Sequence, residues 1–71
     1  MKLTANGKEI TSTPGINVSQ LLVEQKVRMP EMVSVELNGE ILRRHLFDAT
    51  ILKEGDKVEF LYFMGGGRGT F

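Results

Sequence analysis

Two Asn-Gly dipeptides, at residues 6–7 and 38–39, place the strongest constraint on how this chain can fold. Each separates two short runs in which apolar and polar residues alternate, as expected for half-buried strands. Asn-Gly readily adopts the positive φ angles of a two-residue hairpin turn. The sequence therefore predicts two β-hairpins, over residues 1–12 and 33–42.

One short helix is predicted between the hairpins, over residues 18–26. Asn17 is a favourable N-cap, and Gln20, three residues later, completes the pattern of a capping box. The apolar positions then recur at helical spacing and are Val18, Leu21 and Leu22. Such a short helix is not stable alone, so we expect its apolar face to lie on a sheet and Pro30 to limit its length.

The last strand is predicted over residues 57–63, after a tight turn at residues 53–56. It is the most apolar strand, which favours a central place in the sheet. A helical crossover separates it from the first strand, which favours parallel pairing between the two. Its two faces would carry Val58, Phe60 and Tyr62 on one side, and Glu59, Leu61 and Phe63 on the other.

These elements together define the fold class. Residues 43–47, between the second hairpin and the last strand, predict a turn of 3₁₀ helix anchored by Leu46 or Phe47. Two hairpin strands, one helix and the later strands make an α+β sandwich of two layers. The predicted fold is therefore a ubiquitin-like β-grasp, a mixed sheet of four to five strands packed on one helix.

Three consecutive glycines, Gly65, Gly66 and Gly67, follow the last strand. Without a Cβ atom, such a segment can enter a narrow cleft and be contacted closely along its backbone. We therefore expect a β-grasp domain at residues 1–64 that presents a flexible glycine-rich tail at residues 65–71. The alternative is a tail without function, because chain termini are often disordered.

An apolar strip beside the glycines is the candidate partner-binding surface. Leu61 and Phe63 face away from the helix if Val58 faces it, and Met64 continues the strip. Exposed apolar patches rimmed by polar groups often mark partner sites. The alternative is that Phe63 folds over an edge of the core, where we also place Tyr62.

The composition of the 71 residues argues against several classes of function. Nine basic residues balance nine acidic ones, so nothing indicates nucleic-acid binding, and the apolar runs are too short for a membrane span. The chain has no cysteine, so it has neither a disulfide nor a thiol nucleophile, and a cytoplasmic location is the simplest expectation.

The one histidine, His45, has no partners spaced for a catalytic triad or a metal site. We therefore expect no catalytic residue, metal or bound cofactor. We interpret Arg43-Arg44 as a solvated turn. The alternative is that these arginines contact an acidic partner or ATP phosphates.

Three segments carry a more specific pattern: VELNGEI at residues 35–41, LKEGDKVE at 52–59 and FMGGG at 63–67. Together they resemble the ThiS/MoaD family of ubiquitin-like sulfur carriers, and above all its thiamine-biosynthesis branch, ThiS. The similarity extends over nearly the whole chain. The combined pattern is far more specific than a pair of glycines at a chain end.

The resemblance implies a carrier and not an enzyme. In this family an E1-like adenylyltransferase of the ThiF type uses ATP to adenylate the C-terminal glycine carboxylate, which here is that of Gly67. A sulfur donor system, for example one with a cysteine desulfurase, then replaces AMP and leaves a thiocarboxylate. The carrier delivers this sulfur to a thiazole synthase of the ThiG type and supplies no catalytic side chain.

The sequence departs from the family pattern after Gly67, because Arg68-Gly69-Thr70-Phe71 follow. Three explanations are open: trimming of a precursor, for example by a zinc peptidase of the JAMM type; a remnant added for expression; or loss of sulfur transfer. Two other functions are also open. One is sulfur transfer for cysteine, methionine, siderophore or molybdopterin synthesis, and the other is a non-catalytic β-grasp module that binds partners through the apolar strip.

Overall fold

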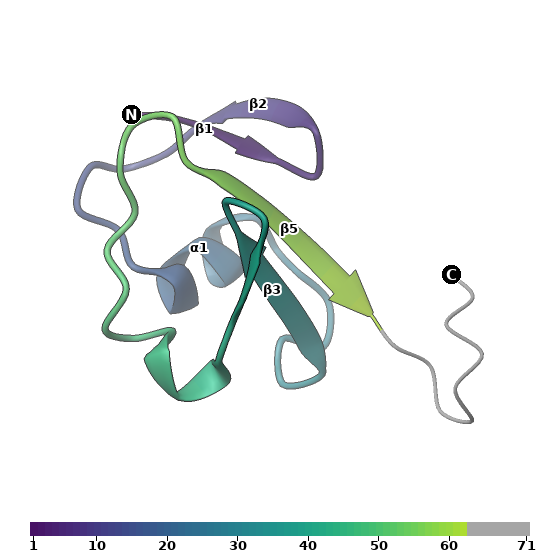
Figure 1. Ribbon diagram of the computed structural model, residues 1–71. Coiled ribbons are helices and arrows are strands. Elements are labelled where there is room, and N and C mark those ends of the chain that lie inside the picture. The colour runs from purple at the N-terminus through teal and green to yellow at the C-terminus, as the bar shows by residue number, and fades with distance from the viewer. Residues whose placement is uncertain (63–71) are drawn as a thin grey trace.

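The structure is a computed structural model that describes residues 1–62; residues 63–71 lie outside the described part. The described residues form five strands, one α-helix and one turn of 3₁₀ helix. They are β1 (Lys2–Ala5), β2 (Lys8–Thr11), α1 (Val18–Glu24), β3 (Val33–Leu37), β4 (Glu40–Leu42), η1 (Arg44–Leu46) and β5 (Lys57–Tyr62). The helix α1 lies on one face of the sheet, and no element of residues 1–62 covers the other face (Figure 1).

The strand order is β2-β1-β5-β3-β4, which places β5 at the centre of a mixed sheet. β5 runs parallel to β1, with Ala5 opposite Val58, and antiparallel to β3, with Val33 opposite Tyr62. The predicted β-grasp fold, the central position of β5 and its parallel pairing with β1 are all confirmed. No helix in residues 1–62 is long and apolar enough to cross a membrane, and the cytoplasmic location stays a prediction.

The helix begins as predicted but ends two residues early. The amide of Gln20 donates to Asn17 Oδ1 at 2.7 Å, and the amide of Asn17 donates to Gln20 Oε1 at 2.9 Å, which completes the capping box. At the other end, Lys26 adopts a left-handed φ of 55°. Its amide donates to the Val23 carbonyl, and the next amide donates to the Leu22 carbonyl, both at 3.0 Å. This pair of bonds is a Schellman motif, which ends a helix because a residue in the left-handed conformation cannot continue a right-handed helix. The predicted extent to Lys26 is therefore wrong.

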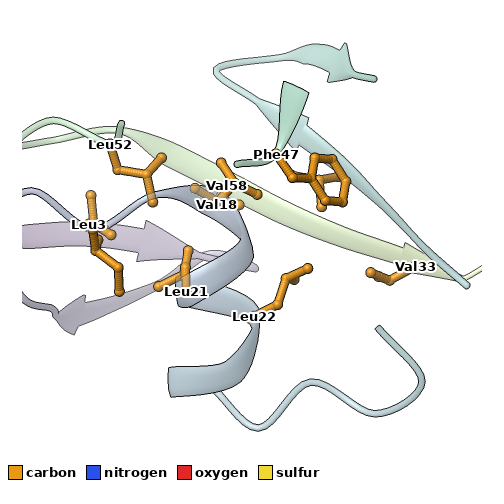
Figure 2. Packing of buried hydrophobic residues seen from close by; sticks show 10 residues of the cluster. Leu3, Val18, Leu21, Leu22, Val33, Phe47, Leu52 and Val58 are labelled. Carbon is orange, nitrogen blue, oxygen red and sulfur yellow. The ribbon is translucent and has the colours of Figure 1, made fainter. Parts of the chain in front are cut away.

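The core lies between α1 and the sheet. Figure 2 shows Leu21 and Leu22 of the helix pointing towards the side chains of Leu3, Val33 and Val58 on the strands. The buried cluster consists of Leu3, Ile16, Val18, Leu21, Leu22, Val33, Val35, Phe47, Leu52 and Val58. Of the two predicted anchors of η1, Phe47 is buried, whereas Leu46 is exposed.

Arg44 has a structural role that the sequence did not indicate. Its guanidinium donates to the carbonyls of Pro30 at 2.9 Å and Val33 at 2.5 Å, and it lies 5.2 Å from the ring centroid of Phe47. These contacts join η1 to the start of β3 and to the loop before it. The interpretation as a solvated turn is therefore incomplete for Arg44, whereas Arg43 is exposed as expected.

Candidate functional site at the end of the last strand

Most of the predicted site residues fall outside the described part of the chain. Phe63, Met64 and the glycines at 65–67 belong to this group, so the glycine tail, most of the apolar strip and the boundary at residue 64 stay predictions. Leu61 is described, and it is half-buried in β5. Its neighbours Phe60 and Tyr62 pack against the core, so the alternation of the strand places Leu61 on the open face as predicted.

The start of β5 is held by Asn38, the first residue of the second Asn-Gly turn. Its side-chain oxygen accepts a hydrogen bond from the Lys57 amide at 2.9 Å. Its backbone amide donates to the Lys57 carbonyl at 2.7 Å, and its side-chain nitrogen donates to Asp56 at 3.1 Å. The asparagine therefore forms a turn and fixes the position where the central strand begins.

Asn6, in the first Asn-Gly turn, holds β5 closer to its end. Its backbone amide donates to the Val58 carbonyl at 2.9 Å, and its side-chain oxygen accepts from the Phe60 amide at 2.8 Å. These bonds extend the parallel ladder beyond the end of β1. Sequence reasoning identified both asparagines as turn residues only, because their bonds to β5 connect segments far apart in the chain.

Tyr62 fixes the last described position of β5. Its hydroxyl donates to the Arg28 carbonyl at 2.7 Å, and the residue lies opposite Val33 in the sheet. The side chain is half-buried and packs against the core, which confirms its predicted place at a core edge. The strand that leads to the glycines is thus fixed from the sides of β1, β3 and the segment after α1.

The open face of the sheet combines apolar and acidic side chains. Leu61 lies opposite Ser34, and Glu59 lies opposite Glu36 on the neighbouring strand. Ile41 of β4 lies opposite Glu36 on its other side and is 60% exposed. Sequence reasoning missed Ile41 as a member of this surface, although the register of the second hairpin places it on the same face.

The described residues offer no arrangement suited to catalysis by this chain itself. Within residues 1–62, no group of three or more His, Cys, Asp or Glu side chains could hold a metal ion. His45 is exposed in η1. The hydrogen bonds of Asn6, Asn38 and Tyr62 instead have a mechanical role, because they hold β5, the strand that leads to the segment with the glycines.

Replacement of Asn6 by glycine tests this mechanical role. Gly-Gly still suits the hairpin turn, but the acceptor for the Phe60 amide is lost. We expect a loss of about 1 kcal/mol in the free energy of unfolding and faster hydrogen exchange at Phe60. Asn6→Asp, which keeps an acceptor oxygen, should preserve the protection of Phe60. Equal protection of this amide in Asn6→Gly and the parent would contradict the role given to the side chain.

Comparison with known proteins assigns the chain to a family. The sequence model of the ThiS family matches residues 1–67. The crystal structure of the thiamine biosynthesis protein ThiS from Geobacter metallireducens is similar to this chain, with 58% identity and a TM-score of 0.88, over 94% of this chain and 100% of that one.

Curated relatives extend the comparison. Thiazole synthases from Magnetococcus marinus and Paramagnetospirillum magneticum are 34% and 37% identical to this chain over 68 and 67 residues. These matches cover 96% and 94% of this chain but 21% and 20% of the relatives, so the chain spans about a fifth of their length. The family match and the shared fold show that the chain belongs to the ThiS family, the β-grasp sulfur carriers of thiamine biosynthesis.

Proposed function

We propose that this chain carries sulfur as a thiocarboxylate on Gly67, for the synthesis of the thiazole of thiamine. The observation that carries the proposal is the family match, which runs from residue 1 to Gly67, the last of the three consecutive glycines. The fixed end of β5 supports it, because a tail loaded by another protein needs a rigid base. Gly65, Gly66 and Gly67 are the proposed reacting segment.

The proposed chemistry has two steps at the carboxylate of Gly67. The carboxylate attacks the α-phosphate of ATP, and pyrophosphate leaves, which gives an acyl adenylate. A sulfide equivalent from the donor then forms a C–S bond as the bond to AMP breaks. Adenylation is needed because a free carboxylate is a poor acyl donor, whereas AMP is a good leaving group. ATP belongs to the partner enzyme, and this chain supplies the reacting carboxylate.

The proposed partners follow from the same chemistry. They are a ThiF-type adenylyltransferase, a sulfur donor system and a ThiG-type thiazole synthase. The matches within two proteins named thiazole synthase support the last of these, since a carrier joined to a synthase would serve it directly. They also favour the thiamine pathway over cysteine, methionine, siderophore or molybdopterin synthesis.

Two further parts of the proposal concern the residues around Gly67. Residues 68–71 must be removed before the carboxylate of Gly67 is free, and a zinc peptidase of the JAMM type suits that cleavage. Leu61, Phe63 and Met64 are the proposed partner-binding residues. Leu61 supports this assignment, since it lies on the open face beside the end of β5.

Release of pyrophosphate from ATP tests the first step. With a ThiF-type adenylyltransferase, a chain that ends at Gly67 should release pyrophosphate, and the chain of 71 residues should not. The matched control is a chain that ends at Gly67 as a carboxamide, which has the same length but no attacking carboxylate. Equal release from the acid and the amide, or none from either, would refute the proposed function.

A further inference from the structure

A groove with a basic rim lies beside the end of β5. It is formed by the β1–β2 turn, the segment that follows α1 and the last residues of β5. The half-buried apolar side chains that line it are Ile10, Val27, Phe60 and Tyr62. Its exposed lining includes Lys8, Lys26 and Arg28.

The charge of this groove is one-sided. Among residues 1–62, no acidic side chain lines it. The chain as a whole has as many acidic as basic residues, so a groove with three cations and no carboxylate departs from the average surface. An apolar base with a cationic rim suits the side chains of a protein segment that is partly apolar and negatively charged.

Lys26 is the most informative residue of the rim, because its positive φ angle is one that glycine adopts more readily than lysine. Four residues other than glycine have positive φ within residues 1–62, and two of them, Asn6 and Asn38, are asparagines in hairpin turns. Lys26 instead occupies the left-handed position of the Schellman motif, where glycine is usual. A lysine in a conformation that favours glycine makes Lys26 a candidate for a role outside the fold.

The position of the groove limits which partner can use it. Gly67 is five residues beyond Tyr62, so even a fully extended chain carries it at most about 18 Å from Tyr62. A protein that encloses Gly67 must therefore lie close to the end of β5. The Tyr62 hydroxyl bonds to the Arg28 carbonyl, which ties that end directly to the groove.

We propose that this groove docks an acidic, partly apolar segment of the adenylyltransferase that receives Gly67, a proposal that rests on the proposed function. Lys26, Arg28 and Lys8 steer the carrier onto the enzyme by charge complementarity. The half-buried side chains, Phe60 and Tyr62 among them, receive the apolar part of the segment. The groove lies on the side of α1 and is separate from the open face that carries Leu61.

Lys26→Gly is the sharpest test, because it separates binding from folding. The substitution removes the charge and relieves the backbone, so the variant should melt at a higher temperature than the parent. In a chain that ends at Gly67, it should nevertheless weaken binding to the adenylyltransferase about threefold. Lys26→Gly combined with Arg28→Gln should weaken binding about tenfold at low salt, with a smaller difference at high salt.

The matched control is the pair Lys2→Gln and Lys53→Gln, which removes two exposed charges beside the turn that precedes β5. Its dissociation constant should change by less than about twofold. Unchanged affinity in the variant with both Lys26 and Arg28 replaced, or equal weakening in the control, would overturn the docking proposal. Adenylation of the parent would still uphold the proposed function in that case. An enzyme that neither binds nor adenylates the parent would overturn both.

Discussion

Replacing Gly67 by valine, in a chain that ends there, should slow formation of the acyl adenylate by about two orders of magnitude. The reason is steric, since a branched side chain on the reacting residue displaces the carboxylate from in-line attack on the α-phosphate. A displacement of about 1 Å is enough for a loss of this size. Alanine, with a single methyl group, should give an intermediate rate. The measurement is the rate of pyrophosphate release at saturating ATP.

The control for this series is stability. The core that the structure describes is built from residues 1–62, and we expect the alanine and valine variants at Gly67 to unfold at the same temperature as the parent. A slower reaction with an unchanged melting temperature then locates the effect at the reacting residue. Adenylation of the valine variant at the rate of the parent would contradict the role given to glycine.

Leu21→Ala should have the largest effect on folding, a loss of about 2–5 kcal/mol in the free energy of unfolding. Leu21 is 0% exposed and lies in α1, where its side chain points into the core (Figure 2). A domain of this size has a total stability of roughly 4–10 kcal/mol. The substitution therefore removes a large part of it, and unfolding in denaturant monitored by circular dichroism measures the change.

Val23→Ala is the matched control on the same helix. Val23 is 77% exposed, so its truncation leaves no cavity, and alanine is the better helix former. Its stability should remain within about 0.5 kcal/mol of the parent. If both variants lost stability equally, the packing of α1 on the sheet would not be the main source of stability.

The sequence predicted the fold because its signals were local and agreed with one another. Asn6-Gly7 and Asn38-Gly39 each mark a two-residue turn, and Asn17 with Gln20 marks the start of the only predicted helix. The end of that helix could not be predicted. A lysine carries no signal for a left-handed conformation, so the Schellman motif at Lys26 is visible only in the structure.

The candidate site was less predictable, because its contacts connect distant parts of the chain. The bond from the Phe60 amide to Asn6 joins residues 54 positions apart, and the bond from Tyr62 to Arg28 joins residues 34 positions apart. The basic groove likewise combines residues from three segments. Alternation along β5 did predict the open face for Leu61, since that inference needs only the neighbouring residues.

The intact mass of the chain ending at Gly67, after incubation with the adenylyltransferase, ATP and a sulfur donor, is the most direct test of sulfur transfer. We expect a mass increase equal to the difference between one sulfur atom and one oxygen atom, located in the C-terminal peptide by fragmentation. The carboxamide chain should keep its mass. An unchanged mass for the acid, under conditions that modify another member of the ThiS family, would contradict the account.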